Sequence, residues 1–485
     1  MGSLPVAEFA TLDAVAQAEL VRNGEVSPKE LIDVSIARVE AHDAALNAVV
    51  IRQFDRARGQ AVSAELPDGP FRGVPMLLKD IGAYLDGDPH YAGMALLKRV
   101  DWREQGESTF AGRLRRAGFV SIGRTNTPEL ALSVTTEPES FGATHNPWNL
   151  AHSPGGSSGG AGAAVAAGYV AVGHSSDGGG SIRIPASHCG LIGLKPTRGR
   201  CSFGPSIGER WGGFSNEGFV TRSVRDTAAL LDVVSGDATG DPYSAPPLPR
   251  PLSAEVGADP GKLRVGVMRA LPGRRELHAD ALAAVDTAAK LLEDLGHHVE
   301  ESHPKALDDP DAGKGFVVVV TSSVAAALES WSEKTGELFG PKSVEPLTWA
   351  VAEIGRTHTA AQYIEAVTFN HAHSRRVAAW WDEGYDLLLT PTSGEPPPEL
   401  GEFEPTTDNP LQGFVRAMPF SAFTSPFNVT GQPAVSLPVH WNAAGLPLGA
   451  QLVAARGRED LLVRVAAQVE DTGCWQGRRP PLSDS

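Results

Sequence analysis

Gly155-Gly-Ser-Ser-Gly-Gly160 and, farther along the chain, Asp177-Gly-Gly-Gly-Ser-Ile-Arg183 are the two segments on which the interpretation of this sequence depends. Glycine lets a backbone turn so that several N–H groups point at one spot. A serine among such N–H groups lies where an oxyanion can form and be stabilised. The two segments therefore predict a site built around a serine nucleophile.

A serine nucleophile needs a base, and the residues alone leave two kinds of candidate open. Three histidines lie near the glycine segments: His152, His174 and His188. The other candidate is Lys79, which ends the apolar run 73–78. Burial at the end of such a run lowers the pKa of a lysine, and a neutral lysine can accept a proton from a hydroxyl.

With these residues in place, the sequence resembles the amidase signature family. That family combines a Gly-Gly-Ser-Ser-Gly-Gly segment with a following Asp-x-Gly-Gly-Ser-Ile-Arg segment and an upstream Leu-Lys-Asp. Further landmarks extend the similarity over nearly the whole chain: Gly123-Arg-Thr-Asn-Thr-Pro-Glu129, His145-Asn-Pro-Trp148, Gly193-Leu-Lys-Pro-Thr-Arg-Gly199, Thr390-Pro-Thr392, Pro426-Phe-Asn-Val-Thr-Gly-Gln-Pro-Ala434 and Gly445-Leu-Pro-Leu-Gly-Ala-Gln-Leu452. Within the family, Thr135-Thr-Glu-Pro-Glu139 and Ser223-Val-Arg-Asp226 favour the 6-aminohexanoate cyclic dimer hydrolases and related bacterial amidases and urethanases.

The resemblance assigns roles to the matching residues. It implies that Ser181 is the nucleophile, that Ser157, following a cis peptide after Gly156, is the bridging serine, and that Lys79 is the base. The implied reaction is hydrolysis of a C–N acyl bond through an acyl-enzyme, without metal or cofactor. Amides, anilides and carbamates all remain open as substrates.

Other residues take implied supporting roles. The oxyanion hole would be formed by backbone N–H groups of Gly178, Gly179, Gly180 and Ser181. Gly156, Ser158, Asp177 and Arg183 would hold the glycine segments in place, and Ala131, Leu132 and Ser133 would line the acyl pocket. The apolar run 317–328 is either a second pocket wall or core. One departure from the family is Ser175-Ser176, where Gly-Thr is usual.

The fold class expected is α/β: the amidase signature fold, with a central mixed sheet of many strands covered by helices on both sides. Alternation of short β-like runs with helices between residues 71 and 200 favours the same class. We expect one domain over 1–485, with N-terminal helices at about 8–65 and a catalytic core at about 66–236. A variable substrate-side region would follow at about 237–425, and a return to the core at about 426–478.

Composition narrows the possible partners. The chain has 485 residues and a net charge of −16, which disfavours a nucleic-acid partner. Three cysteines without a C-x-x-C pair fit a reducing cytoplasm. No signal peptide is expected, and no apolar run is expected to reach the ~20 residues of a membrane span. The partner expected is a small-molecule amide or carbamate, and a homodimer is open because family members are often dimers.

Three alternatives compete with this interpretation. Gly155-Gly-Ser-Ser-Gly159 also fits the nucleophile elbow of an α/β-hydrolase, with Ser157 as nucleophile and a histidine base, but the preceding Asn149-Leu-Ala-His-Ser-Pro154 is no hydrophobic strand. A glutaminase-type subunit of a tRNA-dependent amidotransferase would share the fold and the triad. A catalytically inactive binding module is disfavoured because all three catalytic positions are intact.

Overall fold

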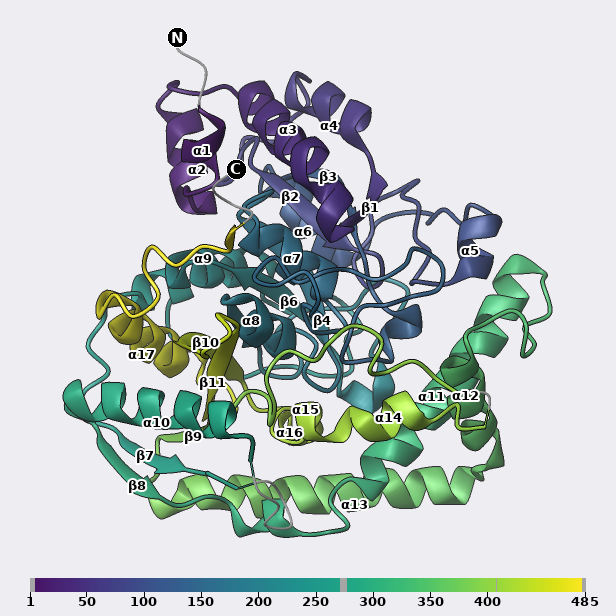
Figure 1. Cartoon of the computed structure of the whole chain (residues 1–485), viewed down its shortest axis with the longest axis vertical. Helices are drawn as coiled ribbons and strands as arrows, with labels where there is room; N and C mark the ends of the chain where they lie inside the picture. The colour runs from purple at the N-terminus through teal and green to yellow at the C-terminus, as the bar shows by residue number, and fades with distance from the viewer. Residues whose placement is uncertain (1–4, 271–276, 407, 482–485) are drawn as a thin grey trace.

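The computed structural model describes residues 5–270, 277–406 and 408–481. Its strands form one mixed sheet of 11 strands in the order β1-β3-β2-β4-β6-β5-β10-β11-β9-β7-β8 (Figure 1). Strands β3, β2 and β4 are parallel, as are β9, β7 and β8, and the remaining pairs are antiparallel. The expected mixed α/β sheet is confirmed.

The bounds of the strands are β1 Val49–Arg52, β2 Pro75–Lys79, β3 Val120–Thr125, β4 Val172–Asp177, β5 Ile192–Lys195, β6 Asn216–Thr221, β7 Arg264–Val267, β8 His298–Glu301, β9 Leu387–Pro391, β10 Ala434–Trp441 and β11 Pro447–Ala454. The bounds of the α-helices are α1 Val6–Phe9, α2 Ala14–Arg22, α3 Pro28–Leu46, α4 Phe54–Ala61, α5 Ala95–Arg99, α6 Thr109–Arg116, α7 Gly159–Ala166, α8 Arg183–Cys189, α9 Val224–Val234, α10 Ala279–Asp294, α11 Lys314–Thr335, α12 Pro346–Thr357, α13 Ala360–Ala378, α14 Gln412–Arg416, α15 Met418–Ser421, α16 Ser425–Thr430 and α17 Glu459–Asp471. Short 3-10 turns are η1 Glu129–Ala131, η2 Trp211–Gly213, η3 Leu252–Glu255, η4 Lys305–Asp308 and η5 Ala379–Glu383.

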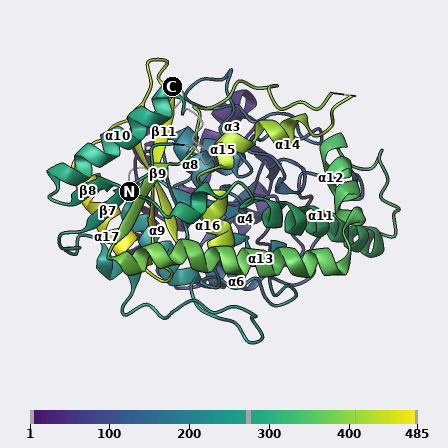
Figure 2. The same ribbon diagram turned by 90° about the horizontal axis from the view of Figure 1, so that it is seen from below.

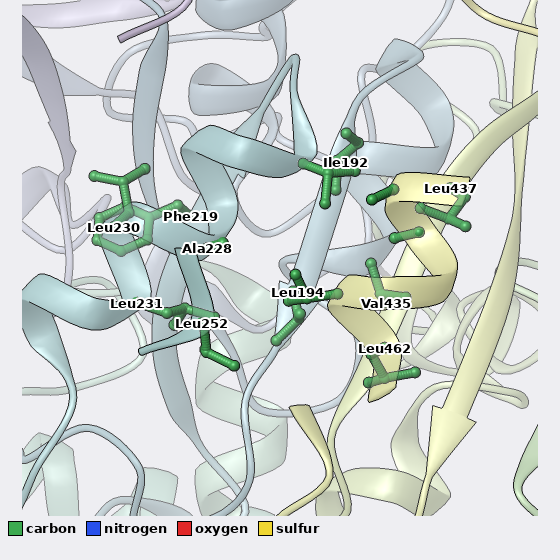
Figure 3. Packing of buried hydrophobic residues seen from close by; sticks show 14 of the residues in the cluster. Ile192, Leu194, Phe219, Ala228, Leu230, Leu231, Leu252, Val435, Leu437 and Leu462 are labelled. Carbon is green, nitrogen blue, oxygen red and sulfur yellow. The ribbon is translucent and has the colours of Figure 1, made fainter. Parts of the chain in front are cut away.

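Both faces of the sheet are covered by helices, and the alternation of side chains along the strands shows why. In β2, Met76 and Leu78 join the core under α6, α9, α10 and α17, whereas Leu77 joins the core under α3, α4, α7 and α8. Successive strand residues point to opposite faces, so two apolar faces each need a helical cover. Figure 3 shows the first of these cores around β5 and β10.

Local sequence signals set the helix ends. Ser27 caps α3, and its hydroxyl and the Glu30 carboxylate form the reciprocal capping box expected from Ser27-Pro28-Lys29-Glu30. Helix α7 is made of small residues because it packs very closely: a Cβ at Gly160 would lie 2.4 Å from the backbone nitrogen of Asn126. The N-terminus of α7 thereby comes close to the ends of β2 and β3.

Helix α11 corrects one expectation, because it is long and apolar enough, by length and composition, to cross a membrane. In the structure it packs against α12 and α13, as Figure 2 shows from below. Val319, Val324 and Leu328 are buried in that packing. These three residues belong to the interior of the protein, whereas only 39% of the most apolar stretch of α11 is buried. The first turns of the helix form part of the cavity described next.

Candidate active site

Sheet topology brings Lys79 to the glycine segments. Lys79 ends β2 and Asp177 ends β4, and these neighbouring parallel strands end at the same edge of the sheet. Lys79 follows Leu77 by two positions, so its side chain points to the sheet face that α7 covers. Ser157 and Ser158 immediately precede α7. The fold thus places the Lys79 side chain between the sheet and the segment that carries Ser157 and Ser158.

Three hydroxyls surround the Lys79 amine. Its Nζ lies 2.7 Å from Oγ of Ser157, 2.9 Å from Oγ of Ser158 and 3.1 Å from Oγ of Ser176. The peptide between Gly156 and Ser157 is cis, as the family resemblance implies. Ser176 supplies the hydroxyl of the usual threonine, and Ser175 sits in the regular ladder between β4 and β6. The departure at Ser175-Ser176 therefore leaves the local backbone intact.

Burial makes Lys79 able to act as a base. The side chain is fully buried, and burial lowers its pKa to about 7. The negative charges of Glu217 and Asp177 oppose this shift, and Arg210 adds to it. Desolvation disfavours the ammonium form, so a large fraction of Lys79 is neutral near pH 7.

A histidine and a glutamate lie behind the lysine. The backbone N–H of Lys79 donates to Nδ1 of His174 at 3.1 Å, and Nε2 of His174 lies 2.7 Å from the carboxylate of Glu217. Burial lowers the pKa of His174, against the pull of Glu217, so the ring is neutral and donates its Nε2 proton to Glu217. From the sequence, His174 is only a candidate base, and its pairing with Glu217 is not predicted.

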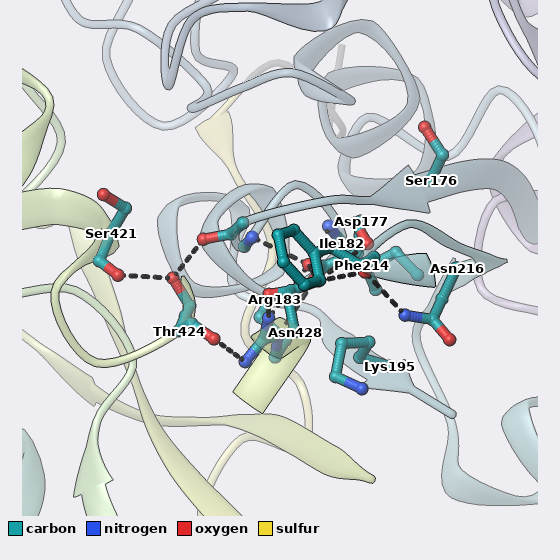
Figure 4. A network of polar contacts seen from close by, with 12 residues as sticks. Ser176, Asp177, Ile182, Arg183, Lys195, Phe214, Asn216, Ser421, Thr424 and Asn428 are labelled. Atoms are coloured by element: carbon teal, nitrogen blue, oxygen red, sulfur yellow. Dashed lines mark hydrogen bonds and ion pairs between the residues drawn. The ribbon is translucent and has the colours of Figure 1, made fainter. Parts of the chain in front are cut away.

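The loop that carries Ser181 is fixed by a buried ion pair. The guanidinium of Arg183 binds both oxygens of the Asp177 carboxylate at 2.9 Å, and both side chains are fully buried. Arg183 also donates to Thr424 and Asn428, which ties the loop to α16 (Figure 4). A further bond to Gln451 ties it to β11. Burial alone would raise the pKa of Asp177, but Arg183 holds it well below its usual range. The prediction that this pair acts as scaffold fits these contacts.

We expect Arg183→Met to lower the free energy of unfolding by about 3–5 kcal/mol, because it leaves a buried carboxylate without its partner. Urea unfolding followed by circular dichroism measures this change. A matched control is Arg115→Met, which removes the partially exposed pair with Glu107 and should cost less than about 1 kcal/mol. Equal losses in the two variants would show that the Asp177–Arg183 pair does not fix the loop.

The oxyanion donors differ from the prediction at Gly180. Its N–H donates to Oδ1 of Asp177 at 2.7 Å, so this group is already engaged. The physical reason is that the Asp177 carboxylate, held by Arg183, accepts from the loop it anchors. Within the described ranges, the N–H groups of Gly178, Gly179 and Ser181 have no acceptor. These three remain available to an oxyanion.

The Ser181 hydroxyl lies at a cavity of about 530 Å³ and has no hydrogen-bond partner in the part of the chain that the structure describes. No hydrogen bond joins it to Ser157. Ala131, Leu132 and Ser133 line the same cavity, as the sequence predicts. Most other walls are apolar: Ile184, Trp211, Phe316, Val317, Val320, Phe414, Met418 and Val429. Of the run 317–328, only Val317 and Val320 reach the cavity.

The histidine-base alternative does not fit this geometry. Ser157 contacts Lys79, and no histidine lies within hydrogen-bond distance of Ser157 or Ser181 among the described residues. His188 is buried against Phe420, and burial lowers its pKa to about 3. His152 bonds the carbonyl of Pro397 through Nδ1. The nucleophile-elbow interpretation of Ser157 is therefore wrong.

Comparison with known proteins identifies the family. A family model described as Amidase matches residues 30–463. The chain is 45% identical over 478 residues to the 6-aminohexanoate-cyclic-dimer hydrolase of Paenarthrobacter ureafaciens, covering 97% of this chain and 96% of that protein.

Solved structures give the same result. The structure of 6-aminohexanoate cyclic dimer hydrolase complexed with substrate superposes with a TM-score of 0.94 at 43% identity, covering 99% of this chain and 100% of the other. A bacterial aryl acylamidase of the amidase signature family superposes with a TM-score of 0.87 at 27% identity, covering 98% of each chain. The protein belongs to the amidase family.

Proposed function

We propose that this amidase hydrolyses C–N acyl bonds through an acyl-enzyme on Ser181, with Ser157 and Lys79 as the proton relay. The observation that carries the proposal is the 2.7 Å contact between the fully buried Lys79 amine and Ser157. The Ser181 hydroxyl lies at the apolar cavity and has no hydrogen-bond partner among the described residues. A nucleophile, a base and unengaged N–H donors are the groups that acyl transfer needs.

In the first half-reaction, Lys79 accepts the proton of Ser157 while Ser157 accepts that of Ser181. Ser181 Oγ forms a bond to the substrate carbonyl carbon, and the N–H groups of Gly178, Gly179 and Ser181 stabilise the oxyanion. Ser157 then gives a proton to the nitrogen as the C–N bond breaks, because an amine anion is a very poor leaving group, and Ser157 takes its own proton back from Lys79. This order of proton transfers requires the Ser157 and Ser181 hydroxyls to come within hydrogen-bond distance in the substrate complex.

In the second half-reaction, water attacks the ester on Ser181. Water gives a proton to Ser157, and Ser157 gives its own to Lys79, while the water oxygen bonds to the acyl carbon. The acyl C–O bond to Ser181 then breaks as Ser157 protonates the Ser181 oxygen, and Lys79 returns its proton to Ser157. No residue outside the three is needed to carry protons in either half. The products are a carboxylic acid and an amine.

The cavity supports a small, mostly apolar amide as the substrate. Its volume of about 530 Å³ and its apolar walls suit aliphatic chains around a single reacting amide. A cyclic amide made from 6-aminohexanoate has that character, and relatives are named for that compound. Anilides and aryl carbamates remain within the proposal, because Trp211, Phe316 and Phe414 offer aromatic surfaces.

The test is product release, followed by mass spectrometry, from a linear amide, an anilide, the 6-aminohexanoate cyclic dimer and an aryl carbamate. We expect turnover of the cyclic dimer. Absence of turnover for all four, with glutamine hydrolysed only when partner proteins are added, would instead support a glutaminase-type subunit. Because Cys189, Cys201 and Cys474 are free thiols, we also propose a reducing, cytoplasmic setting.

The pH dependence of kcat/KM should follow the titration of the Lys79 amine. Because only the neutral amine accepts a proton, kcat/KM should rise as pH increases through about 7 and level off above it. Glu217→Gln removes a negative charge that raises the pKa of Lys79, so the acidic limb should move to lower pH. The glutamine amide oxygen can still accept the hydrogen bond from His174, so this variant removes the charge at position 217 without removing that bond. An unmoved limb in Glu217→Gln would show that the limb does not belong to Lys79.

A further inference from the structure

One wall of the cavity departs from its apolar character. At this wall the first turn of α11 meets α13, far along the sequence from the glycine segments. Gly313 and Phe316 contribute from α11, and His373 contributes from α13. In Figure 2, α13 runs beneath both α11 and α16, the helix that holds the Ser181 loop.

His373 is a buried hydrogen-bond donor at this wall. The residue is only 2% exposed, and its ring stacks on Phe369. A guanidinium N–H of Arg376 donates to Nδ1 at 3.4 Å, and Nε2 has no partner among the residues described. Burial, helped by Arg376 and opposed by Asp309, lowers the pKa of His373, so the ring is neutral. With Nδ1 accepting, the proton lies on Nε2.

The beginning of α11 supplies further donors. Its N-cap residue, Gly313, provides no side-chain cap. The N–H groups of Gly313, Gly315 and Phe316 have no acceptor in the described ranges. The positive end of the helix dipole adds to these donors over the 22 residues of α11.

A second buried polar side chain lies against the same turn. Asn370 is 2% exposed, and neither its Oδ1 nor its Nδ2 has a hydrogen-bond partner among the described residues. It lies one helical turn before His373 on α13. A Cβ at Gly315 would come 2.3 Å from Oδ1 of Asn370, so the amide rests directly on the first turn of α11. Asn370 is not among the residues that line the cavity, so its amide packs behind the first turn of α11.

Charges around the cluster point to a neutral ligand group. Asp309 pairs with Arg376 at 2.8 Å, and Asp308 pairs with His303 at 3.1 Å. Asp308 and Asp309 line the cavity, and its lining in the described structure includes no lysine or arginine that would balance an anion there. The donors therefore suit an oxygen that is polar but uncharged, such as an amide carbonyl.

We propose that Nε2 of His373 and the first turn of α11 bind the carbonyl oxygen of a second amide, remote from the amide that Ser181 attacks. This inference rests on the proposed amidase function and assigns His373 as a specificity-determining residue for substrates whose two amide groups are separated by an apolar spacer. The cyclic dimer of 6-aminohexanoate has two such amides.

The test compares two macrocyclic lactams of nearly equal ring size, the cyclic dimer with two amides and a lactam with one. The quantity measured is the ratio of their kcat/KM values. His373→Phe keeps a ring but removes the donor, and should lower this ratio about tenfold, mainly through KM for the dimer. His373→Gln restores a donor and should restore most of the ratio. His373→Met is a second donor-free variant should the phenyl ring not be accommodated.

The outcomes separate this inference from the proposed function. An equal loss on both lactams in His373→Phe, or no recovery in His373→Gln, would overturn the subsite while leaving the amidase function standing. If the wild-type protein cleaves neither lactam, binding of the dimer to Ser181→Ala is measured by calorimetry with and without His373→Phe. About tenfold weaker binding supports the subsite, and equal binding overturns it.

Discussion

Ser181→Ala is expected to reduce kcat for any amide substrate by about a millionfold, toward the residual rate that binding and oxyanion stabilisation give without a nucleophile. The reason is that no other hydroxyl among the residues described as lining the cavity is assigned a proton relay to Lys79 in this mechanism. Stability should change by less than about 0.5 kcal/mol, because the Ser181 hydroxyl has no protein partner in the described structure. Product formation measured by mass spectrometry over long incubation has the range to test this.

Ser175→Ala is the matched control for the nucleophile. Its hydroxyl is buried in β4, in the same segment as the catalytic groups, and its hydrogen bond in the described structure goes to the carbonyl of Gly173 at 3.4 Å. We expect kcat to change less than about threefold. Turnover in Ser181→Ala comparable to that of Ser175→Ala would mean that Ser181 does not attack the substrate.

Lys79→Met is expected to lower kcat about ten-thousandfold, because it removes the base while keeping an unbranched side chain of similar length. The acidic limb near pH 7 should disappear at the same time, since the titrating amine is gone. Rapid-quench measurement of acyl-enzyme formation across pH 5.5–9 gives both quantities, with these pH limits set about evenly around the pKa.

Lys195→Met is the matched control, because it tests whether loss of any buried lysine with a lowered pKa would reduce kcat as much as loss of Lys79. Lys195 is fully buried, and burial lowers its pKa well below the usual value, yet its Nζ contacts only the carbonyl of Pro196 at 2.9 Å. We expect kcat to fall less than about tenfold in this variant. A Lys79→Met enzyme that keeps its acidic limb would place the base elsewhere.

Much of this site could be predicted from the sequence, because the determinants are local. The capping box at Ser27 and Glu30 depends on residues three positions apart, and the small residues of α7 show that a neighbour packs closely. Ser157, Ser181 and Lys79 lie in compact motifs, so a resemblance can transfer them by position. The contact between Lys79 and Ser157 then follows from two parallel strands ending at one sheet edge.

What could not be predicted depends on contacts between distant segments. Glu217 meets His174 only because β6 pairs with β4, and neither residue lies in a recognised motif. The engagement of the Gly180 N–H by Asp177 is a matter of loop conformation that a motif does not specify. The wall formed by Gly313 and His373 joins two helices whose sequences carry no sign of their partner.

The most direct test of the central claim is covalent labelling with a sulfonyl fluoride, followed by peptide mass spectrometry. A serine activated by the Ser157–Lys79 relay should take one label per chain, on Ser181, and the label should be lost in Ser181→Ala. Labelling should slow strongly in Lys79→Met, because the relay no longer removes the proton. A label on Ser157, or hydrolysis that continues after full labelling elsewhere, would contradict the account.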